Sequence, residues 1–205
     1  MEDNLKKTIQ SYDDTIEEYV EKCDPLHPKK DSDKFLEYLN DGNRILDLGC
    51  GPGRDARVFV EVGKEVVGVD LSEKMIEKAK ERVSEADFKV MDIRDLDFAD
   101  SFFDGVWASA IFIHIPKQEI IESLGETYRV LKPGGIFFLS LKRGEGEGLE
   151  PDKRYGGVEK YWSFFKEDEI KENLRKAGFK IISCEIQVRD PGYATNPWIY
   201  IFCKK

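Results

Sequence analysis

The feature that most constrains the fold is a glycine-rich loop between a short apolar run and an amphipathic segment. Residues 44–48 are mostly apolar, and Gly49, Gly51 and Gly53 then alternate with single residues. Residues 56–62 space their apolar side chains along one face of a helix. Glycine tolerates positive φ and lets a ligand approach the backbone, and the first N–H groups of a helix lack intrahelical partners. The segment therefore predicts a strand, a ligand-binding loop and a helix.

Strands and helices alternate along most of the chain. We predict strands at residues 44–48, 65–70, 88–91, 103–109 and 136–141. Helices are predicted at residues 56–62, 73–83 and 119–130, with Ser72 as the N-cap of the second. This order is typical of an α/β fold with an open, doubly wound parallel sheet and helices on both faces. A helix at 167–177 and strands at 179–188 and 198–203 follow. Only a loop joins these last two strands, so we expect them to pair antiparallel.

Two further segments flank this core. Residues 5–22 have the apolar spacing of one helix, and a short second helix is predicted around residues 35–39. Residues 144–148 read as a flexible acidic loop. We expect a single domain that comprises a helical cap (1–43), a cofactor-binding core (44–142), a substrate or lid insert (143–165) and a closing helix with an antiparallel strand pair (166–205).

Composition narrows the partners and the location. The net charge of -9, without a long basic run, disfavours a nucleic-acid or anionic-membrane partner. The N-terminus lacks a signal-peptide pattern, and the longest apolar stretch, residues 106–113, is too short to span a bilayer. The four cysteines form no C-x-x-C pair, so we expect no metal site and a cytoplasmic protein. Lysine and glutamate (22 each) far outnumber glutamine (3), a thermophile-like composition.

Acidic residues follow the second and third predicted strands. Asp70 comes about 20 residues after the glycine-rich loop, where a carboxylate can accept hydrogen bonds from both hydroxyls of a ribose. Asp92 lies between Met91 and Ile93, which can sandwich an adenine ring while the carboxylate accepts a hydrogen bond from its amine. Each carboxylate can equally be a solvated residue at the end of a strand, and two nearby acids compete with Asp92.

These motifs together resemble the class I S-adenosylmethionine-dependent methyltransferases over about residues 40–142. The first motif spans residues 45–53, the second ends at Asp70, the third contains Asp92, and a typical turn, residues 131–135, precedes the fifth strand. The resemblance implies a Rossmann-like, mostly parallel seven-stranded sheet with one antiparallel strand. It also implies S-adenosyl-L-methionine as the cofactor and S-adenosyl-L-homocysteine as its product.

The resemblance further implies which residues bind the cofactor. Asp47 would fix the loop and help hold the cationic amino group, Asp70 would hold the ribose, and Asp92 would hold the adenine. The full implied set is Asp47, Gly49, Cys50, Gly51, Gly53, Asp70, Leu71, Met75, Met91, Asp92, Ile93, Ser109, Ala110, Tyr12 and Tyr19. Tyr12 and Tyr19 resemble aromatic residues that cover the cofactor in many small members, although ordinary helix packing accounts for them equally well.

Two alternative functions are weighed against a methyltransferase. An NAD-dependent oxidoreductase needs a third glycine for close helix–strand packing, and that position holds Arg54. No Gly-Lys-Ser/Thr sequence follows the loop, so it does not indicate a phosphate-binding P-loop. A non-catalytic S-adenosylmethionine-binding protein would carry the same cofactor motifs and stays open.

The sequence says less about the methyl acceptor, because methyl transfer needs mainly alignment and dehydration. His114 is the candidate general base if the acceptor must lose a proton, and the alternative is a structural histidine at a helix entrance. The insert supplies candidate substrate residues, each of which can also be a packing or surface residue: Arg143, Arg154, Tyr155, Tyr161 and Trp162. We expect a small-molecule acceptor and a monomer or homodimer.

Overall fold

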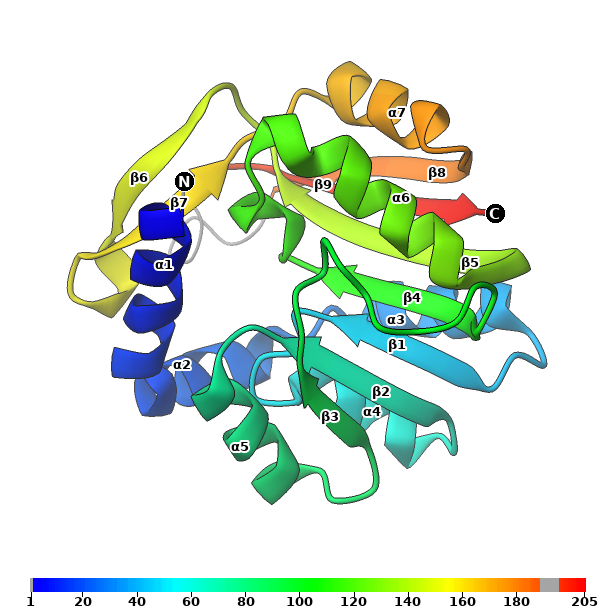
Figure 1. Cartoon of the computed structure of the whole chain (residues 1–205), viewed down its shortest axis with the longest axis horizontal. Helices are drawn as coiled ribbons and strands as arrows, with labels where there is room; N and C mark the ends of the chain where they lie inside the picture. Colours follow the sequence, from blue (N-terminus) through cyan, green and yellow to red (C-terminus); the bar gives the residue numbers. More distant parts are fainter. Residues whose placement is uncertain (1, 189–195) are drawn as a thin grey trace.

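A seven-stranded sheet forms the centre of the molecule in the computed structural model, which describes residues 2–188 and 196–205 (Figure 1). Its strands are β1 (Arg44–Leu48), β2 (Glu65–Asp70), β3 (Asp87–Val90), β4 (Phe103–Ser109), β5 (Leu131–Lys142), β8 (Lys180–Gln187) and β9 (Trp198–Lys204). They are arranged in the order β3-β2-β1-β4-β5-β9-β8. Strand β9 runs antiparallel to both of its neighbours, whereas the remaining pairs are parallel. The predicted doubly wound sheet with one antiparallel strand is confirmed.

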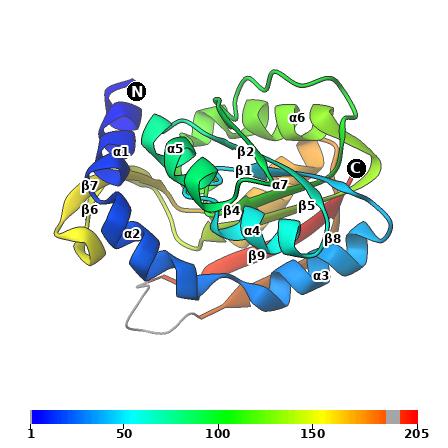
Figure 2. The same cartoon turned by 90° about the horizontal axis from the view of Figure 1, so that it is seen from below.

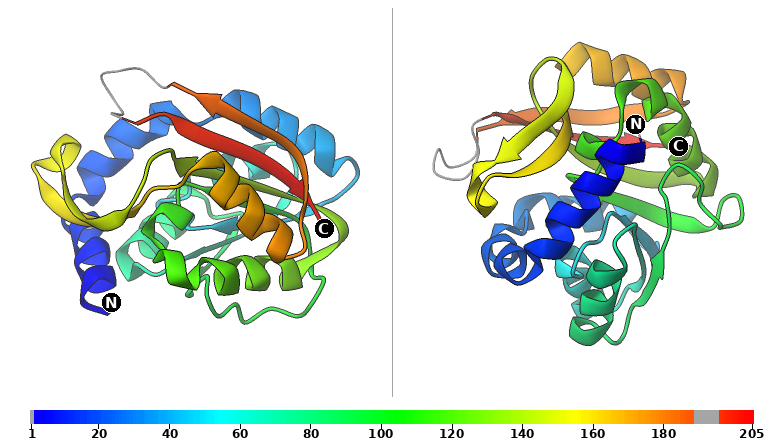
Figure 3. Two further views of the ribbon diagram at one scale, coloured as in Figure 1. Left: turned by 90° about the horizontal axis from the view of Figure 1, so that it is seen from above. Right: turned by 60° about the vertical axis from the view of Figure 1, so that its left-hand side comes forward.

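Helices cover both faces of the sheet, as the predicted crossover pattern requires. They are α3 (Lys29–Leu39), α4 (Arg54–Glu61), α5 (Glu73–Arg82), α6 (Ile120–Val130) and α7 (Glu167–Lys176). Helix α3 lies on one face, and α6 and α7 lie on the other (Figure 3, left). Helix α5 begins where predicted, because the Ser72 hydroxyl accepts a hydrogen bond from the Met75 N–H at 3.0 Å and so caps the first turn.

The core is aromatic where α3 and α4 meet the middle of the sheet. Trp107 of β4 stacks on Phe138 of β5 with ring centroids 3.9 Å apart. Phe35 and Phe59 pack edge-on against the same indole. All four rings are fully buried, and such uninterrupted burial on both faces is expected of central parallel strands. This packing fixes the strand ends from which the loops of the site begin.

Three local predictions need correction. The single helix predicted at residues 5–22 is two helices, α1 (Glu2–Asp14) and α2 (Ile16–Cys23), because Thr15 leaves helical geometry and its hydroxyl bonds back to the Ser11 carbonyl. The turn at residues 131–135 is an irregular part of β5, where the register with β4 shifts. The acidic loop is shorter than predicted, because residues 147–152 form strand β6.

The insert forms a two-stranded antiparallel ribbon beside the N-terminal helix. Strand β6 (Glu147–Asp152) pairs with β7 (Val158–Ser163), and a short 3-10 helix, η4 (Lys153–Tyr155), lies between them. Helix α1 packs on β7, and the Tyr161 N–H donates to the Thr8 hydroxyl at 2.9 Å. Figure 2 shows α1 and the ribbon together beside the carboxyl ends of the parallel strands, where open sheets bind their ligands.

No helix in the described ranges has both the length and the apolar character that are needed to cross a membrane. Among the same residues, no three or more His, Cys, Asp and Glu side chains gather in an arrangement that could hold a metal ion.

Candidate active site

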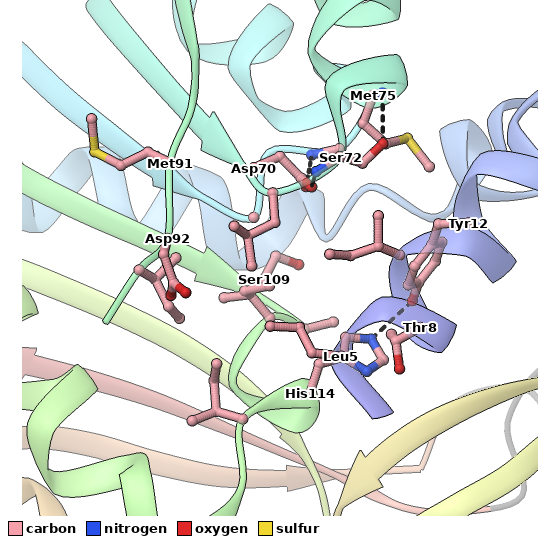
Figure 4. Close-up of a pocket in the computed structure, with 18 of the residues that line it drawn as sticks. Leu5, Thr8, Tyr12, Asp70, Ser72, Met75, Met91, Asp92, Ser109 and His114 are labelled. Carbon is pink, nitrogen blue, oxygen red and sulfur yellow. Dashed lines mark hydrogen bonds between the residues drawn. The ribbon is translucent and has the colours of Figure 1, made fainter. Parts of the chain in front are cut away.

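A cavity of about 760 Å³, counted out to its open mouth, lies at the carboxyl ends of β1, β2 and β4 (Figure 4). Helix α1 closes one side, and the loops after the strands form the rest. The lining residues are Leu5, Thr8, Ile9, Tyr12, Tyr19, Gly49, Gly51, Asp70, Leu71, Ser72, Met75, Met91, Asp92, Ile93, Ser109, Ala110, Ile111, His114 and Ile115.

Asp70 joins the glycine-rich loop to the end of β2. One carboxylate oxygen accepts the Gly51 N–H at 3.0 Å, and the other accepts the Ser72 N–H at 2.9 Å. Burial raises the pKa of Asp70, and these backbone hydrogen bonds oppose that rise. A carboxylate offers about four acceptor positions, so the group retains capacity for a bound hydroxyl. Asp70 lines the cavity and therefore both fixes the loop and presents an acceptor.

The three glycines of the loop serve different purposes. Gly49 has a φ of +65°, and a Cβ there would lie 2.6 Å from Ile111, so neither the backbone nor the space admits a side chain. A Cβ on Gly51 would meet no atom nearer than 3.9 Å, which leaves this side of the loop open to a ligand. Gly53 is the N-cap of α4, and a Cβ there would lie 3.2 Å from Val83 at the end of α5. The structure therefore does not place Gly53 in the cavity lining, unlike Gly49 and Gly51.

A smaller cavity lies under the loop and shares Tyr19, Gly49 and Ser109 with the first. Asp47 and Cys50 line it, and both are buried. The Oδ2 atom of Asp47 has no hydrogen-bond partner among the described residues. Burial raises the pKa of Asp47 well above its usual value, and the negative charge of a neighbouring aspartate adds to this effect. Burial likewise raises the pKa of the Cys50 thiol.

Asp92 enters the same cavity from the loop after β3, between Met91 and Ile93. Its carboxylate accepts two hydrogen bonds from the Arg94 Nε, at 2.9 and 3.0 Å, and Arg94 also bonds Glu119 at 2.6 Å. Burial alone would raise the pKa of Asp92, but the hydrogen bonds from Arg94 lower it on balance. Asp92 is therefore held as an ionised acceptor with apolar side chains on either side.

Comparison with known proteins identifies the protein family in which this fold and loop occur. A family model described as a methyltransferase domain matches residues 45–135. A 27-O-demethylrifamycin SV methyltransferase from Amycolatopsis mediterranei is 35% identical over 158 residues, which are 72% of this chain and 57% of that protein. A solved SAM-dependent methyltransferase from Methanosarcina mazei has a TM-score of 0.75 at 25% identity, covering 82% of this chain and 95% of the other. The chain belongs to the class I S-adenosylmethionine-dependent methyltransferases.

Another solved methyltransferase covers almost the whole chain. The 1,6-didemethyltoxoflavin-N1-methyltransferase from Burkholderia thailandensis, crystallised with 1,6-didemethyltoxoflavin and S-adenosylhomocysteine, has a TM-score of 0.79 at 24% identity. The alignment covers 98% of this chain and 86% of that chain, so the fold is shared from end to end. The chain spans about half the length of the curated relatives it matches.

The residues of the two cavities fit the cofactor of this methyltransferase family. S-adenosylmethionine contains a cationic amino group, a ribose and an adenine. The buried oxygen of Asp47 that has no partner among the described residues is a suitable acceptor for the amino group. Asp70 and Asp92 line the larger cavity from adjacent strands, and the open side of Gly51 allows the connecting chain to pass.

His114 lines the larger cavity with both ring nitrogens engaged (Figure 4). The Nδ1 atom lies 2.7 Å from the Tyr161 carbonyl oxygen and must donate to it. The Nε2 atom, 2.9 Å from the Tyr12 hydroxyl, therefore accepts. Burial lowers the pKa of His114 to about 3. A base that weak is poorly matched to neutral pH, so this geometry favours the structural alternative, in which His114 ties α1 to the ribbon.

We expect replacement of His114 by glutamine to remove part of the acid sensitivity of the folded protein. The folded ring has a pKa of about 3, below the value of ~6.5 in the unfolded chain. The unfolded state therefore binds more protons between these values, and the stability from the neutral ring, complete above pH ~6.5, is lost as pH falls. Urea unfolding at pH 7 and pH 5 should show about 2 kcal/mol more loss in the wild type than in His114→Gln. Equal losses in both proteins would contradict this assignment.

The structure separates the candidate acceptor residues into two groups. Tyr161 lines a cavity next to the first, while Tyr155 and Trp162 are buried in the wall behind it. Arg154 lies nearby on η4 and pairs with Asp152 at 2.7 Å. Arg143 is exposed and lines none of the cavities described here. The structure therefore brings four of the five predicted residues together and leaves Arg143 apart.

Helix α1 contributes lining residues that the sequence reasoning did not assign to the site. Leu5, Thr8 and Ile9 face the cavity together with Tyr12. Their spacing of three and four residues marks one helix face, and this signal was available in the sequence. It shows that the face is buried, but it does not show which part of the fold covers it.

Proposed function

We propose that the chain binds S-adenosylmethionine across the two cavities and transfers its methyl group to a small-molecule acceptor. The observation that carries this proposal is the placement of two acceptors around the glycine-rich loop. The Oδ2 atom of Asp47, which has no hydrogen-bond partner among the described residues, lies under the loop. Asp70 lies beside the loop in the adjoining cavity. S-adenosylmethionine carries a cationic amino group and a ribose, separated by a short chain, so one molecule can donate hydrogen bonds to both acceptors.

Each remaining part of the cofactor has a matching set of residues. The adenine fits between Met91 and Ile93 with its amine directed at Asp92, while Leu71 and Met75 pack beside the ribose. Tyr12 and Tyr19 come from α1 and α2 and cover the open side. Ser109 and Ala110, directly after β4, would line the place where the methyl group meets the acceptor.

The protein's contribution to the reaction is alignment and exclusion of water. When bound, S-adenosylmethionine would supply an electrophilic methyl group to the acceptor and would be left as a thioether. Leu5 and Ile9 line the cavity from α1, so this helix can keep water from the reacting atoms. Tyr12 is oriented by its hydrogen bond to His114. A base is required only if the acceptor must lose a proton during transfer.

Several properties support a small acceptor in place of a macromolecule. The segments beyond the core are α1, α2 and the ribbon, which enclose a cavity and do not form a separate domain. The net charge of -9 disfavours nucleic acid. Two relatives are named for small acceptors, 27-O-demethylrifamycin SV and demethylmenaquinone. We propose a cytoplasmic enzyme that acts as a monomer or homodimer.

Methyl transfer should be detectable with labelled cofactor. We expect calorimetry to show binding of S-adenosylhomocysteine, and a panel of small metabolites incubated with methyl-labelled S-adenosylmethionine to yield at least one labelled product. Binding of NAD without S-adenosylhomocysteine would support the oxidoreductase alternative and contradict the proposal. Binding of the cofactor with no labelled product across the panel would instead support a non-catalytic binding protein.

A further inference from the structure

Three cationic side chains gather on the acceptor side of the site: Lys142 at the end of β5, Arg154 on η4 and Lys160 on β7. We call them the basic cluster. The Lys160 ammonium lies 3.8 Å from the ring centroid of Tyr12, which lines the main cavity. The Lys142 ammonium lies 3.1 Å from the ring centroid of Trp162. The cluster therefore stands directly behind the aromatic wall of the cavity.

Within the part of the chain that the structure describes, the basic cluster contains more positive charge than there is buried negative charge beside it. Asp152 accepts two hydrogen bonds from Arg154, at 2.8 and 2.7 Å, and one from Lys160 at 3.3 Å. Lys142 has no hydrogen bond or ion pair with any residue that the structure describes, although Glu150 acts on it over a longer distance. Among the described residues, the three cations thus share one buried carboxylate, Asp152. This excess is unusual in a chain with a net charge of -9.

Burial makes this excess costly. The Lys160 side chain is 0% exposed, the Asp152 side chain 4% and the Arg154 side chain 24%. Burial lowers the pKa of Lys142 to about 7 and the pKa of Lys160 to about 8, with the charge of Arg154 contributing to both. Buried charges in proteins are normally paired, and an uncompensated one costs several kcal/mol. An anion bound beside Lys142 would supply the missing charge.

The strand order places the basic cluster away from the cofactor loop. Strand β5 borders β4 on the side opposite β1, and β1 leads into the glycine-rich loop. Ser109 and Ala110, at the end of β4, lie between that loop and the end of β5. His114 touches both regions, since it lines the cavity and lies 4.9 Å from Trp162 between ring centroids. The cluster is therefore on the side where the acceptor would enter.

We propose that the basic cluster binds a carboxylate, or an equivalent anionic group, of the methyl acceptor, so that the substrate is an acidic small molecule. This inference rests on the proposed methyltransferase function and narrows its substrate class. Lys142 supplies the direct contact, because Arg154 and Lys160 are already held by Asp152. The apolar part of the acceptor would lie toward Trp162 and the cavity wall. The carboxylate of the cofactor itself is the competing source of the same chemistry.

A matched pair of probes tests the charge preference without knowledge of the substrate. Benzoate and benzamide have similar shapes and differ in charge. We expect calorimetry on the protein loaded with S-adenosylhomocysteine to show benzoate binding at least ten times more tightly than benzamide. Lys142→Gln should bring the two affinities within about twofold, whereas Lys142→Arg should keep most of the difference. Lys153→Gln, an exposed lysine of the same insert, is the control and should leave the preference unchanged.

Affinity for S-adenosylhomocysteine separates the possible results. If Lys142→Gln binds it as the wild type does, the variant is folded and the lost preference belongs to the acceptor site. If that affinity falls at least tenfold while the benzoate preference stays, the cluster serves the cofactor carboxylate and the proposal is wrong. Equal binding of benzoate and benzamide to the wild type also overturns it. Failure of the wild type to bind S-adenosylhomocysteine would count against the methyltransferase function itself, independently of the probe result.

Discussion

Asp70→Ala is expected to weaken S-adenosylhomocysteine binding about 100-fold or more. The carboxylate holds the Gly51 and Ser72 N–H groups and is proposed to accept the ribose hydroxyls. Hydrogen bonds to charged groups contribute ~1.5–3 kcal/mol each, and tenfold in affinity corresponds to ~1.4 kcal/mol. Loss of the ribose contacts together with a loosened loop therefore reaches about 2.8 kcal/mol or more, which corresponds to 100-fold. Isothermal titration calorimetry at neutral pH measures the change directly.

The matched control for Asp70→Ala is Asp97→Ala. Asp97 is an exposed acid after the third strand and lines none of the cavities described, so its removal should change affinity less than twofold. Asp70→Asn should fall between the two, because the amide retains one acceptor oxygen but turns an N–H toward a backbone donor. An Asp70→Ala protein that melts normally and binds within threefold of the wild type would show that the ribose assignment is wrong.

The parallel core was predictable because its signals are local. Strands β1, β2 and β4 have the predicted limits, since an uninterrupted apolar run bounded by turn residues needs no knowledge of distant contacts. The cofactor loop and Asp70 could be predicted from their spacing in the sequence. A strand, a tight loop and a helix that follow one another directly fix the position of a binding loop through short-range geometry. The Ser72 cap followed for the same reason.

Long-range pairing explains what the sequence did not indicate. The ribbon of β6 and β7 is stabilised by α1, about 150 residues away, through contacts such as that of Thr8 with the Tyr161 N–H. Lys142 and Lys160 come from different sheets and read as ordinary surface lysines until the fold brings them together. Arg143, adjacent in sequence to Lys142, was the more obvious anion ligand but is exposed. Alternation along β5 decides which of the two neighbours turns inward.

Arg54 has a role in the structure that its position in the glycine motif did not indicate. Its side chain at the third glycine position weakened the oxidoreductase interpretation. In the structure the Arg54 side chain is mostly buried, with 16% of it exposed, and the guanidinium bonds both oxygens of Asp55, at 2.7 and 2.8 Å. It also lies 3.4 Å from the hydroxyl of Ser109, at the site itself. Arg54 therefore has a structural role beside the proposed cofactor site.

Removing the partner of Arg54 should destabilise the protein strongly. Asp55 accepts hydrogen bonds from Arg54, from the Trp107 indole N–H at 2.8 Å and from the His27 Nδ1 at 2.8 Å. Asp55→Ala would leave a buried guanidinium and an indole N–H without their acceptor. Breaking one side of a buried ion pair costs ~3–5 kcal/mol. We expect a loss of this size in the free energy of unfolding, measured by urea denaturation at pH 7.

The charge of Asp55, and not only its shape, is expected to matter. Burial alone would raise its pKa, but Arg54 and His27 hold the pKa well below the usual range. A depressed carboxyl pKa gives stability that is complete above the unfolded value of ~3.9 and is lost as pH falls below it. Asp55→Asn should therefore lose most of the free energy of unfolding that Asp55→Ala loses at pH 7. Its free energy of unfolding should also change less between pH 5 and pH 3 than that of the wild type. Glu61→Ala, an exposed acid on the same helix, should stay within ~0.5 kcal/mol of the wild type. Wild-type stability in Asp55→Asn would mean that the hydrogen-bond geometry alone holds Arg54 in place.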